Sequence, residues 1–202
     1  MAKKLGIVAL VVLLLIGLAL GILWKRLTAL PDWYESPDMI AEDGSPRVDQ
    51  DWVRIPHGEP HAGGYVLRNP HLRSQAKQAP LQKAIKKSRA TYDGGDLEAG
   101  AVINLSEMDL DSMSPQERER YQQTIDAFPA LTGRDVYVGI EGGVDKGDGT
   151  IALGRDTKLR IGDTRYSLAN AAKRLNMSEA QLRESIEKEL ARMNVQIPAE
   201  TE

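Results

Sequence analysis

The sequence predicts an α+β protein with an N-terminal single transmembrane helix, a proline-rich stalk, and a small antiparallel sheet packed by two to three amphipathic helices. Three observations lead to this fold class: an uncharged apolar run near the N-terminus, seven prolines between residues 27 and 80, and mixed strand and helix patterns after residue 93. We therefore divide the chain into a head (1–4), a span (5–24), a stalk with a basic helix (25–92), an α+β domain (93–198) and a polar tail (199–202).

The apolar run begins at Leu5, ends at Trp24 and contains neither a charged residue nor proline. At ~1.5 Å per residue, a helix of this length crosses a hydrocarbon core of roughly 30 Å. A cleaved secretory signal is the alternative, but the run exceeds the ~7 to 15 apolar residues of such signals. Gly17 and Gly21 form a GxxxG pattern. This pattern either allows two such helices to pack closely or arises by chance, because glycine is common in membrane helices.

Basic residues flank the run on both sides, with Lys3 and Lys4 before it and Lys25 and Arg26 after it. A short basic head is normally retained in the cytoplasm, so we expect the body on the periplasmic side of a bacterial inner membrane. The chain lacks cysteine, which excludes disulfides and thiolate chemistry. Expected partners are the lipid bilayer, other membrane or envelope proteins, and a second copy through the transmembrane helix.

Between residues 27 and 80, prolines recur too often for regular structure to extend far, because each removes a backbone donor. Two short alternations interrupt this stalk, at residues 52–55 and 65–68. Either is a candidate edge strand.

The histidines also lie in the stalk, where His57, Glu59 and His61 alternate. In an extended segment these side chains share one face, so two imidazoles and a carboxylate would converge on a divalent metal. The intervening Gly58 and Pro60 instead favour a surface loop. We therefore expect no metal and no cofactor, with these three residues as the only metal candidates.

A basic block at residues 68–89 contains seven lysines and arginines and no acid, and a mainly acidic stretch at 93–126 follows it. The apolar spacing around Ala84 and Ile85 predicts a helix with its lysines facing outward. Such a helix is a solvated surface, pairs with the acidic stretch, or contacts anionic lipid or another polyanion. Nucleic acid is not expected, because no aromatic residue interrupts the block. The candidate contact residues are Lys83, Lys86, Lys87 and Arg89.

Within the α+β domain, residues 101–105 predict a strand. Ser114, Pro115 and Glu117 form a capping box with proline at the first helical position, which predicts a helix from there to Ala127. Residues 135–140 and 150–161 predict an antiparallel hairpin around a glycine- and aspartate-rich turn. That turn lacks the alternating acidic ligands of a calcium loop.

Two helices are predicted near the C-terminus, the first at residues 167–176. Ser178 and Gln181 form a second capping box, and the helix that follows carries an apolar stripe through Leu182, Ile186 and Leu190. Residues 195–197 predict a short returning strand.

This region carries two resemblances. Residues 168–186 are similar to a helix-turn-helix of DNA-binding regulators, but the second helix contains four glutamates, which do not suit phosphate contact. Residues 158–164, 166–169, 176–182 and 195–198 resemble the LysM module, a βααβ unit that binds glycans containing N-acetylglucosamine. The LysM resemblance implies envelope glycan binding.

Common enzyme motifs are absent: the sequence contains no G-x-S-x-G, no P-loop and no H-E-x-x-H. The formal net charge of −3 gives no bulk preference for polyanions. We therefore expect a non-enzymatic accessory, scaffold or assembly protein. An envelope glycan-binding module and a membrane-tethered enzyme of unrecognised class are the alternatives.

Overall fold

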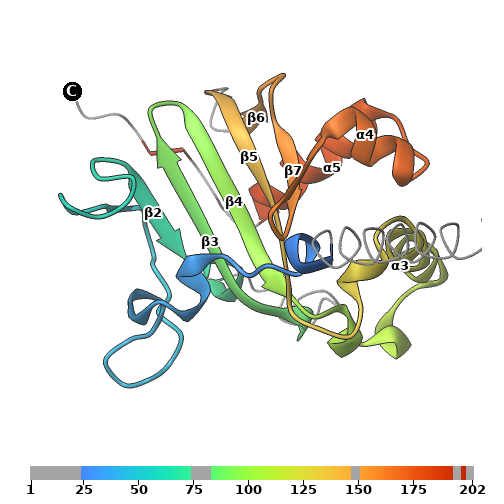
Figure 1. Ribbon diagram of the computed structural model, residues 1–202, viewed down its shortest axis with the longest axis horizontal. Coiled ribbons are helices and arrows are strands. Elements are labelled where there is room, and N and C mark those ends of the chain that lie inside the picture. The colour runs from blue at the N-terminus through green and yellow to red at the C-terminus, as the bar shows by residue number, and fades with distance from the viewer. Residues whose placement is uncertain (1–23, 74–82, 147–150, 193–196, 199–202) are drawn as a thin grey trace, which may run out of the picture.

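The computed structural model describes residues 24–73, 83–146, 151–192 and 197–198. An antiparallel sheet of eight strands forms its centre, in the order β1-β2-β3-β4-β5-β7-β8, with β6 paired to β5 (Figure 1). The strands are β1 (Val53–Arg54), β2 (Tyr65–Arg68), β3 (Ile85–Asp93), β4 (Asp96–Ile103), β5 (Val136–Lys146), β6 (Ile151–Leu153), β7 (Lys158–Ile161) and β8 (Thr164–Ser167). The longer helices are α3 (Pro115–Ala127), α4 (Leu168–Arg174) and α5 (Glu179–Arg192).

The capping signals predicted the starts of the helices correctly. Ser114 and Glu117 form a reciprocal capping box at the start of α3, and Ser178 and Gln181 do the same at α5. These side chains bond to amides that would otherwise have no partner in the first turn. The strands expected at residues 52–55 and 65–68 and the 135–161 hairpin are also present, with both β6 and β7 paired to β5.

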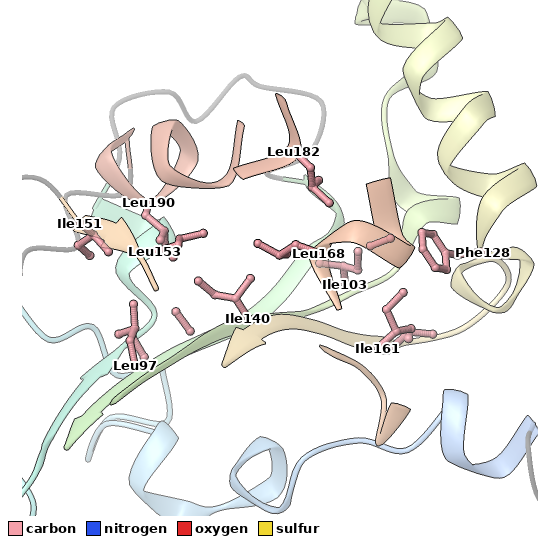
Figure 2. Packing of buried hydrophobic residues seen from close by; sticks show 14 of the residues in the cluster. Leu97, Ile103, Phe128, Ile140, Ile151, Leu153, Ile161, Leu168, Leu182 and Leu190 are labelled. Carbon is pink, nitrogen blue, oxygen red and sulfur yellow. The ribbon is translucent and has the colours of Figure 1, made fainter. Parts of the chain in front are cut away.

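One face of the sheet forms the core with α4 and α5. Leu97, Ile103 and Ile140 point from the strands toward Leu168 and Leu190 of the helices (Figure 2). Side chains alternate between the two faces of a strand, so every second residue of β4 and β5 enters this core. The helical stripe predicted from the sequence is thus the surface that packs on the sheet.

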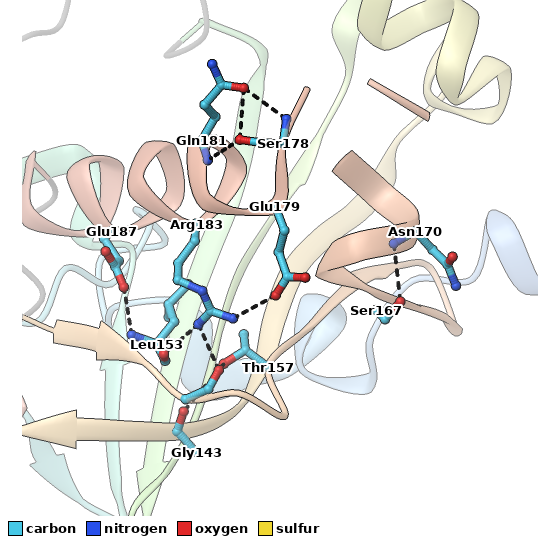
Figure 3. Close-up of polar contacts among 11 residues, drawn as sticks. Gly143, Leu153, Thr157, Ser167, Asn170, Ser178, Glu179, Gln181, Arg183 and Glu187 are labelled. Carbon is cyan, nitrogen blue, oxygen red and sulfur yellow. Dashed lines mark hydrogen bonds and ion pairs between the residues drawn. The ribbon is translucent and has the colours of Figure 1, made fainter. Parts of the chain in front are cut away.

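Polar side chains of α5 hold β6 in place (Figure 3). Arg183 Nη1 donates to the carbonyl oxygens of Leu153 and Gly154 at 2.5 and 2.8 Å, and the Leu153 amide donates to Glu187 Oε1 at 2.9 Å. These bonds satisfy backbone groups on the side of β6 that faces away from β5. They therefore close an edge of the sheet that would otherwise be open.

Replacement of Arg183 by methionine is expected to lower the free energy of unfolding by about 1–3 kcal/mol, because the Leu153 carbonyl loses its donor, whereas the Gly154 carbonyl still accepts from Thr157. Urea unfolding measures this loss. Lys188→Met, at an exposed position of the same helix, is the control and should change stability by less than about 0.5 kcal/mol. Equal stability of the two variants would contradict the role given to Arg183.

The opposite face of the sheet is largely polar, and residues 24–39 run across it. We call this segment the strap; it contains the short helices η1 (Asp32–Glu35) and η2 (Pro37–Met39). In Figure 2 the blue N-terminal ribbon lies on the side of the sheet away from α5. The sheet is therefore the middle layer between the helices and the strap.

The predicted fold class is wrong about the stalk and the size of the sheet. Residues 25–92 supply the strap and three strands, β1, β2 and β3, which continue directly into β4. The prolines of the described ranges lie outside these strands, where their missing amide breaks no hydrogen bond between strands. Proline frequency therefore marked the connections of one sheet.

The basic helix expected around residues 81–89 is also wrong, since residues 85–93 form β3. Ser88, Ala90 and Tyr92 are buried in alternation, and β3 pairs with β2 on one side and β4 on the other. Two ladders of backbone hydrogen bonds and a buried face outweigh a weak local helix preference. The apolar pattern around Ala84 and Ile85 covers too few residues to distinguish a helix from a strand.

The membrane-spanning prediction is corrected too. Within the described ranges, no helix has both the length and the apolar character needed to cross a membrane. Leu5, Gly17 and Gly21 lie outside these ranges, as do residues 193–196 and the tail at 199–202. Trp24 lies inside them, and the Arg134 guanidinium is 4.6 Å from the centroid of the Trp24 ring. The fold class and the single-pass localisation that depended on this helix are contradicted.

Candidate binding groove

A groove of about 820 Å³ lies between the strap and the polar face of the sheet. This volume is within the range typical of ligand sites. The strap contributes one wall and strands β3, β4, β5 and β7 contribute the floor. Its lining includes Leu30, Trp33, Asp38, Arg89, Glu98, Tyr137 and Arg160.

Tyr137 forms the centre of the floor. Its ring lies over Gly100 and Gly139, where an added Cβ would stand only 2.4 and 2.5 Å from the Tyr137 Oη. Trp33 of the strap contacts the ring edge-on at a centroid distance of 6.0 Å, and Oη donates to Glu98 at 3.1 Å. Burial, together with the negative charge of Glu98, raises the pKa of Tyr137, so the phenol keeps its proton.

The cation next to Tyr137 has its charge balanced. Arg160 Nη1 donates to Glu98 at 2.8 Å, and Nη2 reaches Asp163 at 3.3 Å. The same guanidinium lies 5.0 Å from the centroid of the Tyr137 ring. Two carboxylates and an aromatic face therefore already occupy Arg160.

A second arginine, Arg68, ties the strap to the sheet. Its Nε donates to Asp38 at 3.0 Å and its Nη1 to Asp49 at 2.8 Å. Arg68 and Asp49 are almost completely buried, and the Asp49 carboxylate also accepts the Arg68 amide at 3.0 Å. Burial raises the pKa of Asp38, but hydrogen bonds from Ser36 and Arg68 outweigh it and leave that pKa below its usual value.

Arg89 differs from both of these arginines. It stands on β3 between Arg68 of β2 and Gly100 of β4, and it is half-buried. Among the described residues its Nε is buried without a hydrogen-bond partner, and no carboxylate lies within ion-pair distance. Burial lowers the pKa of Arg89, but an arginine remains cationic at neutral pH. Arg89 is therefore a cation of the groove without a salt bridge in the described part of the chain, and Asp38, Glu98 and Glu59 act on it at longer range.

Tyr34, four residues before Asp38, gives the strap a second attachment. Its Oη donates to Asp135 at 3.0 Å, and Lys87 Nζ donates to the Tyr34 carbonyl at 2.6 Å. Lys87 also lies 5.0 Å from the centroid of the Tyr34 ring. Burial, followed by the hydrogen bond to Asp135, raises the pKa of Tyr34 to about 12. Tyr34 and Asp38 thus both attach the C-terminal part of the strap to the rest of the molecule.

A smaller hollow of about 320 Å³ continues the groove and shares Thr91, Glu98 and His61 with it. This hollow is acidic, with Asp93, Asp96, Glu141 and Asp156 in its lining and Lys158 as a basic member. Glu98 pairs with Arg160, and Glu141 pairs with Arg165. No ion pair joins the three aspartates to another described residue.

The four residues predicted to contact a polyanion have different partners in the structure. Lys83 pairs with Asp109, and Lys86 pairs with Glu107, so these two lysines neutralise part of the acidic stretch. Lys87 holds the strap through the Tyr34 carbonyl. Arg89 alone of the four lines the groove.

Two of the three predicted metal candidates line the groove. Glu59 and His61 line it, whereas His57 does not. Across the described ranges, no three histidine or acidic side chains are close enough together to hold a metal ion. Positive φ angles at Gly58 and His61 place these residues in a tight loop, as the intervening glycine indicated.

A serine and a histidine also come together, although the sequence did not predict it. His71 Nδ1 lies 2.5 Å from Ser88 Oγ, but both residues are at most 3% exposed. A substrate cannot reach a hydroxyl buried to this degree. We therefore interpret the pair as structural, with His71 fixing the connection between β2 and β3.

Burial lowers the pKa of His71 from 6.5 to about 4, which predicts a pH-dependent stability. Below pH 6.5 the unfolded chain takes up a proton at this imidazole that the folded chain does not accept. The free energy of unfolding should therefore fall as the pH drops toward 4, by up to about 3 kcal/mol from this group. Urea unfolding of the wild type and His71→Asn across this range measures the difference; equal pH dependence would contradict the prediction.

Sequence reasoning missed Glu98, Tyr137 and Arg160, because it identified only the apolar faces of these strands and assigned no role to the polar side chains between them. A signal was present in the polar and glycine residues that alternate with apolar ones in β4 and β5. Gly100 and Gly139 have no side chain, and so mark the place where the Tyr137 ring lies against the sheet. The pairing of these two strands could not be read from either alone.

The strand pairing also bears on the LysM resemblance. A βααβ unit pairs its first and last strands, but β7 already has β5 on one edge and β8 on the other. A strand returning after α5 would therefore find no free edge on β7.

Comparison of the chain with protein families, with curated proteins and with solved structures gives no match. The function is therefore argued from the groove.

Proposed function

We propose that this chain is a non-enzymatic accessory or scaffold protein that binds a partner protein in the groove under the strap, with Arg89 taking an acidic group of the partner. One observation carries this proposal: the half-buried Arg89 guanidinium lines the groove without a salt bridge to another described residue, and Asp38, Glu98 and Glu59 act on it only at longer range. A ligand carboxylate that contacts the accessible part of this half-buried side chain would form a charge-assisted pair with it.

The neighbouring groups support recognition over catalysis. Arg160 and Arg68 are fully engaged with carboxylates, Tyr137 keeps its proton, and the Ser88–His71 pair is buried away from the groove surface. These contacts fix the walls around Arg89. A rigid wall lowers the entropy cost of binding, because few side chains must become ordered.

Isothermal titration with an acidic peptide, acetyl-Gly-Gly-Glu-Gly-Gly-amide, tests the proposal. The full-length chain should bind it with about millimolar affinity, and Arg89→Gln should weaken binding about tenfold or more. Arg54→Gln, at an exposed position on β1, is the matched control and should bind as the wild type does. Equal affinities of the Arg89→Gln variant and the wild type, or no binding by the wild type, would overturn the proposal.

A further inference from the structure

We infer that the groove takes an extended, bipolar polypeptide segment: an acidic residue on Arg89 and a basic residue about 13 Å away in the acidic hollow. This inference rests on the proposed function and specifies the partner further. It comes from three features of the described residues, namely the continuity of the two hollows, the opposite charges at their ends, and the spacing along β3.

Continuity comes from the shared lining. Thr91, Glu98 and His61 border both hollows, so one ligand can pass from the larger to the smaller. Thr91 and Glu98 face each other directly across β3 and β4. A small ligand would fill one hollow, whereas a chain segment can use both.

The spacing follows from the strand. Arg89, Thr91 and Asp93 occupy alternate positions of β3 and therefore lie on the same face. A strand rises about 3.3 Å per residue, so Arg89 and Asp93 are about 13 Å apart along it. Four residues of an extended ligand span the same length, which places its acidic and basic side chains at positions i and i+4.

The charges at the far end favour a cation. Asp93 and Asp96 are exposed neighbours across the β3–β4 turn, and Asp156 lies against Gly143 and Gly154 on the other side of the hollow. Lys158 is the basic side chain in that lining, so carboxylates outnumber it. A lysine or arginine of the ligand would pair with these aspartates.

Fluorescence anisotropy with labelled peptides tests the inference on the full-length chain. The probe is Gly-Glu-Ser-Gly-Ser-Lys-Gly, compared with its lysine-to-glutamine form, a form with adjacent glutamate and lysine, and the reversed sequence. We expect the better of the two directions to bind about tenfold more tightly than the glutamine and adjacent forms. The Asp93→Asn/Asp96→Asn variant should lose this preference, whereas Asp111→Asn, at an exposed site elsewhere, should retain it.

The outcomes separate the two proposals. If glutamate-containing peptides bind through Arg89 but the lysine and its spacing make no difference, the bipolar ligand is overturned and the proposed function stands. If free glutamate or lysine competes as well as the full peptide, a polypeptide ligand is overturned. If no glutamate-containing peptide binds, both proposals fail.

Discussion

Replacement of Arg68 by methionine is expected to lower the free energy of unfolding by about 3–5 kcal/mol, one of the two largest effects that we predict for a single substitution. Arg68 pairs with Asp49 and Asp38, and both Arg68 and Asp49 are nearly inaccessible to water. Methionine fills a similar volume, but it leaves the buried Asp49 carboxylate with only the partly exposed Arg47, whose Nε lies 3.2 Å from Asp49 Oδ1. Urea unfolding followed by circular dichroism measures the loss.

Two further variants identify the cause. Arg68→Met combined with Asp49→Asn should recover part of the lost stability, because the buried charge is removed. Arg54→Met, exposed on β1, should change stability by less than about 0.5 kcal/mol. A loss below about 1 kcal/mol for Arg68→Met would contradict the central position that we give this ion pair.

The second large effect is expected at Gly162, in the turn between β7 and β8. Gly162→Ala should cost about 2–4 kcal/mol, since alanine is strained at a φ of +56° and its Cβ would lie 2.3 Å from the Arg26 carbonyl oxygen of the strap. That same oxygen accepts a hydrogen bond from the Asp163 amide at 2.7 Å. The substitution should therefore displace the start of the strap from the sheet.

Gly94 provides a matched control for this prediction. It also begins a two-residue hairpin turn with a φ of +56°, but nothing lies within 4 Å of the point where an added Cβ would stand. Gly94→Ala should therefore show the backbone strain alone, about 1–2 kcal/mol. Hydrogen exchange at the Asp163 amide should quicken in Gly162→Ala and remain unchanged in Gly94→Ala. Equal stability losses in both variants would contradict the contact with the strap.

Local signals predicted local structure well. The serines at positions 114 and 178 mark helix starts because their partners lie three residues away in the same chain. The β3 strand could not be recognised in the same way, since its stability comes from β2 and β4. The strap was missed for a similar reason: Asp38 and Arg68 meet across thirty residues, and no spacing rule predicts such a contact.

The candidate site was predicted in part. The basic block includes Arg89, but nothing in its spacing distinguishes this arginine from the neighbouring lysines. Pairing distinguishes them, because Lys83 and Lys86 find carboxylates on a distant segment and Arg89 does not. Which charges of a sequence remain unpaired is a property of the fold, and therefore had to come from the structure.

Nuclear magnetic resonance of the arginine Nε–H groups tests most directly whether Arg89 receives an acidic group. The Arg89 signal is assigned by its loss in Arg89→Gln, and the full-length chain is titrated with acetyl-Gly-Gly-Glu-Gly-Gly-amide. We predict that the Arg89 signal shifts progressively to saturation while the Arg54 signal stays in place, and that the glutamine form of the peptide causes no shift. An Arg89 signal that remains unmoved by the acidic peptide would contradict the account.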